Sequence, residues 1–134
     1  MAVTSNTTIP SYSDFSVNFD VNPITGDLLK VTGVNSVVQS LMNLVQINYY
    51  EKPFHPEIGS NIRAMLFDPI DPITANVISK EVQNLIINFE PRVNVLSVVV
   101  QADYENNGYR VEIQFEVLSI NNIFTISTFL QRLR

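Results

Sequence analysis

The sequence contains no cysteine, and His55 is its single histidine. The absence of cysteine excludes disulfide bonds, thiolate nucleophiles and zinc sites built from cysteine. A single histidine also excludes a metal site that needs several imidazole ligands. The four glycines are scattered among turns, so the chain lacks a glycine-rich loop that could hold a phosphate group. We therefore predict neither a cofactor nor a metal site.

Basic residues are also few in this chain. Eight lysine and arginine residues stand against thirteen acids among 134 residues, which gives a formal net charge of −5. This balance argues against a nucleic-acid-binding protein, whose surface is usually basic. No apolar run approaches the roughly 20 residues that a bilayer crossing needs, and the first residues lack the charged and apolar regions of a signal peptide. Nucleic acid and membrane are therefore not among the expected partners.

The length of the chain fits one domain with a buried core. Residues 1–14 are rich in Ser, Thr and Asn and are expected to form a flexible tail, so the domain would span residues 15–134. Apolar and polar residues alternate over 15–19, as in a half-buried strand. Turn-forming residues at 22–27, followed by an apolar run at 28–31, then predict the second arm of a hairpin.

A helix and a short helical segment are predicted next. Apolar residues recur with a helical period over residues 34–47, and Asn35 or Ser36 is expected to cap this first helix. Residues 59–67 predict one to two further helical turns. The residues of this short segment that are expected to face the core are Ile62, Leu66 and Phe67.

A second long helix follows a proline-rich stop. Asp71 is suited to cap it and Pro72 to occupy its first position, where a missing N–H costs nothing. Pro91 ends the helix, because a proline disfavours the helical conformation of the residue before it, Glu90. The residues on its expected apolar face are Ile73, Val77, Ile78, Val82, Leu85, Ile86 and Phe89.

The C-terminal third predicts an antiparallel sheet. Residues 93–100 are apolar on both faces, which is typical of a central strand covered on each side. A tight hairpin signal at 105–108 leads into residues 109–118, which alternate cleanly between apolar and polar. A turn at 119–122 and a last strand at 124–130 complete the pattern. We predict an α+β fold, in which an N-terminal hairpin and two main helices pack on a C-terminal antiparallel β-meander.

Glu90-Pro91-Arg92 is the sharpest local feature. A proline extends the residue before it, so the side chains of Glu90 and Arg92 can project to the same side of the chain. An exposed pair would offer a carboxylate and a guanidinium fork to a partner. The alternative is a helix stop followed by two solvated charges.

The last predicted strand is the second candidate surface. It contains no proline, no bulge signal and no charge before Arg132. If it lies at the edge of the sheet, its unpaired backbone groups could accept a strand from a neighbouring chain. The alternative is an edge that the N-terminal tail or hairpin covers.

Four acids lie around the proline-rich region, namely Glu51, Glu57, Asp68 and Asp71. A glycoside hydrolase would need two of them in one cleft, at about 5–5.5 Å for retention or about 6.5–9.5 Å for inversion. The two aspartates suit helix ends and the two glutamates lie in loops, where solvated acids are common. These residues therefore favour no catalytic pair.

Several segments of the chain, taken in order, resemble one known family. They are Thr25-Gly26-Asp27, the loop Pro53-Phe54-His55-Pro56-Glu57-Ile58-Gly59, then Leu66-Phe67-Asp68, and finally Glu90-Pro91-Arg92. Their order and spacing are similar to those of the baseplate wedge, or sheath-initiator, family of T4-type contractile phages, which has relatives in type VI secretion and other contractile injection systems. The resemblance extends from Phe15 to the C-terminus.

This resemblance implies a non-enzymatic subunit of the virion, located in the tail baseplate and assembled in the cytoplasm of the bacterial host. Its implied partners are other baseplate wedge proteins and the tail sheath subunit, with the tail tube as a further candidate. By analogy, Glu90, Pro91 and Arg92 would dock to the core bundle of the wedge, and the last strand would face the sheath. The implied sheath-facing residues are Phe124, Ile126, Thr128, Leu130, Arg132 and Arg134.

Two other functions stay open on the sequence. Relatives of this family have carried a lysozyme label, so the first is a small peptidoglycan-cleaving enzyme that would use Glu51 or Glu57 with another acid. The second is a free-standing binding module, which predicts a covered edge strand. The sequence offers no acid pair in a recognisable catalytic context, and the structural role is the leading hypothesis.

Overall fold

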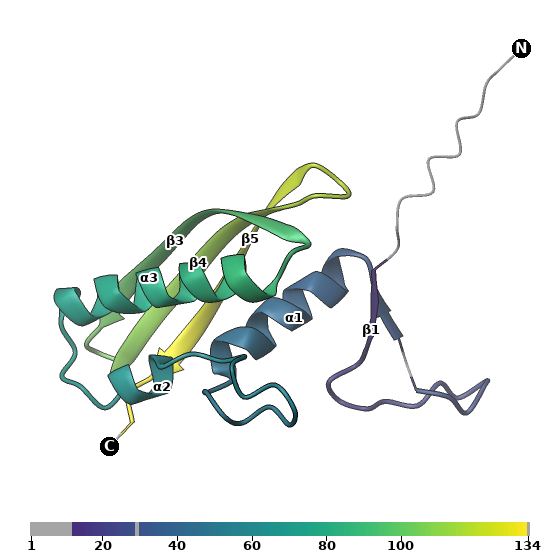
Figure 1. Ribbon diagram of the computed structural model, residues 1–134, viewed down its shortest axis with the longest axis horizontal. Helices are drawn as coiled ribbons and strands as arrows, with labels where there is room; N and C mark the ends of the chain where they lie inside the picture. Colours follow the sequence, from purple (N-terminus) through teal and green to yellow (C-terminus); the bar gives the residue numbers. More distant parts are fainter. Residues whose placement is uncertain (1–11, 29, 134) are drawn as a thin grey trace, which may run out of the picture.

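The computed structural model describes residues 12–28 and 30–133 and shows an α+β fold, as predicted. Figure 1 shows the helices α1 and α3 lying over one face of a three-stranded sheet, with a small hairpin projecting from one end of the body. Among the described residues, none of the helices combines the length and apolar character that a bilayer crossing requires. The elements in chain order are β1 (Ser13–Phe15), β2 (Lys30–Thr32), α1 (Val34–Gln46), α2 (Ile62–Met65), α3 (Pro72–Phe89), β3 (Val93–Asp103), β4 (Gly108–Val117) and β5 (Asn122–Gln131).

The N-terminal hairpin forms, but its first strand lies earlier than predicted. β1 pairs antiparallel with β2, with Ser13 opposite Thr32. The residues that follow β1 leave the strand, and Val17 and Phe19 are exposed. The prediction of a half-buried strand over 15–19 is therefore wrong, because the hairpin lies away from the core and offers this alternating pattern no surface to cover. Most of the expected tail, residues 1–11, lies outside the described residues.

The first long helix begins at Val34, as its apolar period predicts. Its N-cap is Gly33 rather than Asn35 or Ser36. Gly33 has φ of +65°, in the left-handed region that glycine adopts at little cost. Ser36 instead turns its hydroxyl back and donates a hydrogen bond to the Gly33 carbonyl at 2.7 Å. Backbone geometry, and not a capping side chain, therefore starts this helix.

The start of α3 is as predicted. The Asp71 carboxylate accepts a hydrogen bond from the Thr74 N–H, and Pro72 occupies the first turn. The predicted apolar face is only partly correct, because Ile73 and Val77 are exposed. These two lie on the far side of the helix from the buried stripe, whose members are Ala75, Ile78, Val82, Leu85 and Ile86.

The short helix also forms where it was expected. Ile62 and Leu66 are buried, as predicted. Phe67 is exposed, so the expectation that it faces the core is wrong. A segment of one helical turn offers a single narrow inner face, which these two aliphatic residues already fill.

The sheet has the order β3-β4-β5, with β4 in the centre. The expectation that the strand beginning at Val93 is central is therefore wrong, and Leu96 and Val99 of β3 are exposed. The α3 helix covers only one face of β3. The apolar residues on the opposite face of this strand are therefore exposed to solvent. β4 alternates as predicted, and its helix-facing residues are fully buried, namely Tyr109, Val111, Ile113, Phe115 and Val117.

Phe115 should therefore contribute strongly to stability. Its side chain has no exposed surface, and its ring centroid lies 6.0 Å from that of Phe124 on β5. We expect Phe115→Ala to lower the free energy of unfolding by about 3–5 kcal/mol, because it removes buried apolar surface and leaves a cavity. Gln114→Ala, one residue away on the open face, should change it by less than about 0.5 kcal/mol. Urea denaturation followed by circular dichroism measures both, and equal losses would contradict this description of the core.

Candidate functional site

Glu90-Pro91-Arg92 forms the corner between the end of α3 and the start of β3. The Arg92 Nε donates a hydrogen bond to Glu90 Oε1 at 2.6 Å, and its Nη2 donates to Oε2 at 2.8 Å. Two parallel bonds of this kind are the strongest geometry for an arginine and a carboxylate. The side chain of Glu90 is 3% exposed and that of Arg92 is 25% exposed. The corner is therefore closed by a buried ion pair.

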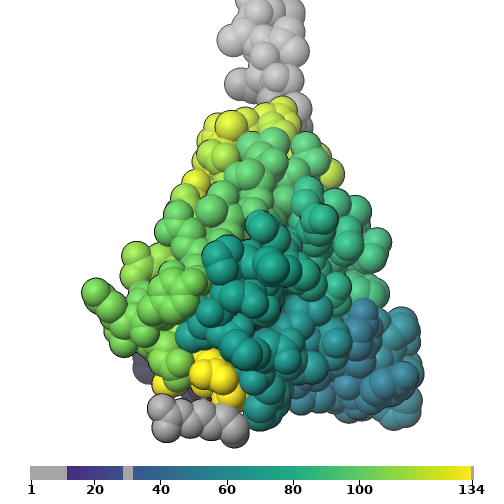
Figure 2. Space-filling model, turned by 90° about the vertical axis from the view of Figure 1, so that its left-hand side faces the viewer, coloured from purple at the N-terminus to yellow at the C-terminus, as the bar shows by residue number. Residues whose placement is uncertain are grey.

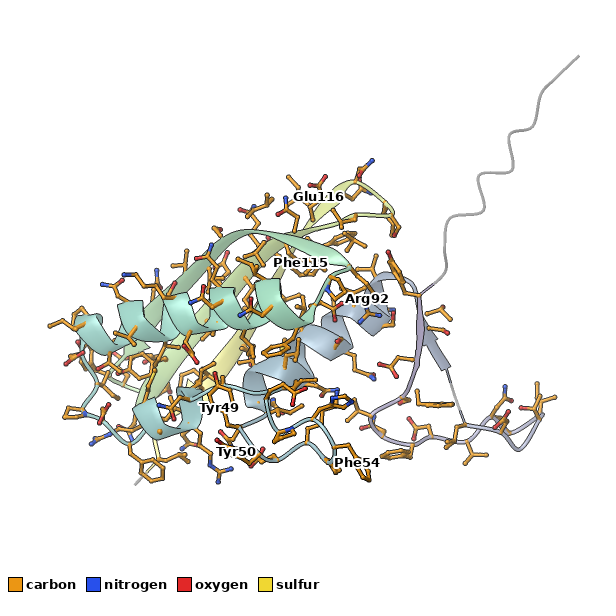
Figure 3. All side chains as sticks on the ribbon, in the orientation of Figure 1. Tyr49, Tyr50, Phe54, Arg92, Phe115 and Glu116 are labelled. Atoms are coloured by element: carbon orange, nitrogen blue, oxygen red, sulfur yellow. The ribbon has the colours of Figure 1, made fainter. Side chains whose placement is uncertain are left out.

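The ion pair also connects segments that are distant in sequence. Ser40 of α1 donates its hydroxyl hydrogen to Glu90 Oε2 at 2.5 Å. The guanidinium carbon of Arg92 lies 5.4 Å from the ring centroid of Tyr12, a distance typical of a cation–π contact. Figure 3 shows Arg92 near the end of α3, beside the base of the hairpin. One pair of charges thus joins α1, α3, β3 and the residue before β1.

This geometry corrects the prediction for the corner. Glu90 was expected to present its carboxylate to a partner, but it is buried and both of its oxygens accept hydrogen bonds within the chain. The alternative of two solvated charges is wrong for the same reason. The extended backbone before Pro91 does bring the two side chains to the same side, but they face each other. The accessible parts of the corner are Pro91 and the outer part of the Arg92 guanidinium.

The surroundings of Glu90 stabilise its charged form. Burial alone would raise the pKa of this carboxyl group, because it removes water from the charge. The hydrogen bonds from Arg92 and Ser40 outweigh that cost and hold the pKa of Glu90 below its usual range. The hydrogen bonds to Glu90 also raise the pKa of Arg92, which stays charged.

The second site is the outer edge of β5, and hydrogen-bond parity shows which residues form it. The Arg132 N–H donates to the Asn107 carbonyl at 3.0 Å, in the same register that pairs β4 with β5. In an antiparallel ladder, every second residue bonds to the same neighbour. The residues that bond to β4 are therefore Leu130, Thr128, Ile126 and Phe124. The residues of β5 that turn their N–H and C=O groups away from β4 are Ile123, Thr125, Ser127, Phe129 and Gln131.

This parity corrects the predicted edge residues. β5 is an edge strand, and among the described residues no backbone hydrogen bond reaches its outer side. The predicted residues Phe124, Ile126, Thr128 and Leu130, however, lie opposite the buried residues of β4, so their side chains point towards the helices. The alternating set that the prediction passed over carries the outward backbone groups. That alternation was visible in the sequence, but which half faces out depends on where the helices lie.

Arg132 and Arg134 follow the last residue of β5. The Nε atom of Arg132 is enclosed and has no hydrogen-bond acceptor within the described part of the chain. Arg134 lies outside the described residues. The backbone N–H of Arg132 bonds to Asn107, so it does not point to the outer side of β5.

The opposite edge of the sheet, on β3, is protected. Its register with β4 shifts between Val95 and Ser97, which marks a bulge. Ser79 of α3 donates its hydroxyl hydrogen to the outward Val98 carbonyl at 2.7 Å. Bulges and covering groups are the usual ways to prevent a strand from pairing with another chain. The two edges of the sheet are therefore unequal, and β5 is the open one.

The loop between α1 and α2 carries a further exposed surface. Tyr50 and Phe54 are 85% and 97% exposed, on the loop between α1 and α2. Both have positive φ values, +68° and +66°, which bulky residues rarely adopt. Figure 3 shows these two side chains at the lower side of the molecule. Backbone strain of this kind is concentrated at functional segments, but no sequence pattern predicts it.

The acids considered for catalysis have local structural contacts. The Glu51 carboxylate accepts hydrogen bonds from the backbone and side-chain amides of Asn48, which lower the pKa of Glu51. The pKa of Glu57 is also lowered. The causes are a hydrogen bond from the Glu57 backbone N–H and a contact of its carboxylate with the His55 ring at 3.2 Å. A glycosidase general acid needs the opposite shift, a raised pKa.

The two aspartates lie at and just before the start of α3. Asp71 caps α3, and the hydrogen bond from the Thr74 backbone lowers the pKa of its carboxyl group. Asp68 is exposed at the surface before the helix. The lowered pKa values of Glu51, Glu57 and Asp71 are therefore the opposite of what a glycosidase general acid requires.

Comparison with known proteins identifies similar chains. The model of the family described as Baseplate wedge protein gp25 matches residues 31–122. Baseplate wedge protein gp25 of Enterobacteria phage T4 is 30% identical over 92 residues, which cover 69% of this chain and 70% of that protein. The segment that the family model matches includes the Glu90-Pro91-Arg92 corner and ends at the first residue of β5.

Two solved structures share the fold. A protein of Geobacter sulfurreducens, provisionally named a tail lysozyme, has a TM-score of 0.68 at 23% identity, covering 74% of this chain and 90% of that one. A chain of the anti-feeding prophage baseplate has a TM-score of 0.64 at 19% identity, covering 92% of this chain and 88% of that one. At these identities, the likeness shows a common fold.

The corner makes a prediction about pH. Because the pKa of Glu90 is lowered on folding, its charge stabilises the native state above the ordinary carboxyl pKa, and that stabilisation is lost as pH falls through the lower native value. Glu90→Gln removes one charged partner and should lower the free energy of unfolding by about 1–3 kcal/mol at neutral pH. The difference from the wild type should shrink as pH falls below about 4.5, the ordinary value for glutamate.

Urea denaturation at several pH values measures this difference. Glu112→Gln, at an exposed position on the open face of β4, is the matched control and should leave stability nearly unchanged. A Glu90→Gln effect that is equally large at acid and neutral pH would contradict the assignment of a charged, paired Glu90.

Proposed function

The chain belongs to the family of baseplate wedge protein gp25, and from this membership we propose how it acts in assembly. Membership confirms the resemblance found in the sequence, and the chain is a structural baseplate component of a contractile tail-like particle. We propose that it docks to other wedge proteins through the corner at Glu90-Pro91-Arg92. We also propose that its β5 edge starts sheath polymerisation by accepting a strand from a sheath subunit, during assembly in the host cytoplasm.

The proposal that β5 accepts a strand is supported by the difference in protection between the two edges of the sheet. β3 has a bulge and a serine from α3 over its outer side, whereas β5 presents outward backbone groups along its ten residues with no such protection among the described residues. A long unprotected edge is a liability unless another chain pairs with it. Pairing through the main chain provides affinity with little side-chain selectivity.

The corner supports a docking role as a rigid surface and not as a free charge. The bidentate ion pair and the Ser40 hydrogen bond fix Glu90 and Arg92, so little side-chain entropy is left to lose when a partner binds. Pro91 is exposed and conformationally restricted, and the outer guanidinium of Arg92 can still donate hydrogen bonds. A wedge protein would then contact a preformed shape.

The alternatives have less support. One structural neighbour is named as a tail lysozyme, but this chain's Glu51, Glu57 and Asp71 have lowered pKa values and local hydrogen bonds. A free-standing binding module predicted a covered edge strand. Neither the hairpin nor any other described segment pairs with the outer side of β5.

Ser127→Pro tests strand addition at β5. The Ser127 N–H points away from β4, so a proline there leaves the internal ladder intact and removes a donor from the outer side. Ile126 is unsuitable for this test, because its N–H bonds to β4. We expect particles carrying Ser127→Pro to form baseplates but to lack polymerised sheath in electron micrographs.

Ser127→Ala is the matched control, because it removes the hydroxyl and keeps the backbone donor. Sheath should form normally on this variant. Sheath of normal length on Ser127→Pro baseplates would show that the β5 edge does not nucleate it.

Pro91→Asp tests the docking corner separately. The substitution adds bulk and charge at an exposed position, and its effect on the free energy of unfolding should stay below about 1 kcal/mol. We expect incorporation into baseplates to fall at least tenfold, measured by quantitative immunoblot of purified particles. Asn94→Asp adds the same charge at an exposed position nearby and should be incorporated normally. Equal incorporation of both variants would remove the corner from the docking surface.

A further inference from the structure

An apolar cavity of about 150 Å³ opens beside the C-terminal end of β5, between the sheet and the helices α1 and α2. In Figure 2 the end of the chain, in yellow, lies at the surface next to the teal segment that contains α2. The residues that line the cavity are Val45, Gln46, Asn48, Ile62, Arg63, Leu66, Leu130 and Leu133. Val45, Ile62, Leu66 and Leu130 are buried aliphatic residues, whereas Gln46 and Arg63 are exposed at the rim.

The size and lining of this cavity suit one large apolar side chain. A cavity of roughly this volume lined by aliphatic residues can hold a six-membered carbon ring. It is open to the surface, so a side chain can enter it without unfolding of the protein. Among the described residues, Arg63 is the only charged one that lines it, and Arg63 lies at the exposed rim.

The position of Leu130 connects the cavity with the open edge. The side chain of Leu130 points towards the helices, and its backbone groups bond to β4. A strand added antiparallel on the outer side of β5 would place one residue directly opposite Leu130, with its side chain on the same face and its Cβ about 4.5–5.5 Å away. Since Leu130 turns no backbone group towards that strand, the two would form a non-hydrogen-bonded pair, in which side chains come closest. The opposing side chain would enter the cavity.

We propose that this cavity is the register anchor of the added strand, and that it binds one leucine-sized or phenylalanine-sized side chain of the incoming segment. The proposal rests on strand addition at β5. Backbone pairing alone would permit the strand to slip, and a slip of one residue turns every side chain to the opposite face. An apolar residue seated against Leu130 and Val45 would permit a single register. The partner is therefore an extended segment with a large apolar residue on its helix-facing side.

Filling the cavity tests the anchor. Leu133 lines it from just beyond the end of β5, so Leu133→Trp should occupy the space, while Leu133→Met keeps the volume nearly unchanged. We expect Leu133→Trp baseplates to carry at least tenfold fewer polymerised sheaths than Leu133→Met baseplates, with equal incorporation of both variants.

Ser127→Pro in the same assay separates the two proposals. If Ser127→Pro blocks sheath growth and Leu133→Trp does not, the anchor is wrong while strand addition stands. If neither variant blocks growth, strand addition itself is wrong.

Photo-crosslinking identifies the occupant independently of any loss of stability in Leu133→Trp. A benzophenone amino acid in place of Gln46, at the exposed rim, should crosslink to the sheath subunit in assembled particles, at or beside a large apolar residue of one extended segment. The same probe in place of Gln83, an exposed residue of α3, should not. Crosslinks from position 46 to a wedge protein, to a second copy of this chain or to its own residues would overturn the proposal.

Discussion

The buried ion pair between Glu90 and Arg92 sets the geometry on which the other features depend. It holds the end of α3 against the start of β3. Glu90 also accepts a hydrogen bond from Ser40 of α1, and the guanidinium of Arg92 lies over the ring of Tyr12. A buried carboxylate without these partners would be strongly unfavourable. These contacts fix the corner to α1 and to the start of the sheet, and they leave Pro91 exposed there.

The three strands of the sheet have different roles. β4 buries its helix-facing residues and forms the core, β3 is closed by a bulge and by Ser79, and β5 stays open. A subunit with one rigid corner and one open edge can be held by one neighbour while it offers backbone groups to another. The proposed cavity beside Leu130 would add what main-chain pairing lacks, a single register. None of these tasks requires a reaction, which agrees with a structural family.

The limits of the sequence are clearest at the candidate sites. The extended backbone before Pro91 was predictable and does bring Glu90 and Arg92 to the same side. Their burial was not, because it depends on Ser40, fifty positions away in the chain. The last strand was likewise predicted as an edge, but the residues named for its outer side turn their backbone groups to β4 and their side chains towards the helices. Alternation shows that two faces exist, and only the placement of α1 and α3 decides which one is covered.

The sequence by itself determined the local elements of this protein. Helical periodicity located α1 and α3, Asp71 and Pro72 started α3, and strict alternation placed the buried residues of β4, because these signals act between residues that are close in the chain. Tertiary structure alone decided the order of the strands, the closed edge at β3, the open edge at β5 and the burial of Glu90. Those features arise from contacts between distant segments, and no pattern within a single segment encodes which surface its neighbour will cover.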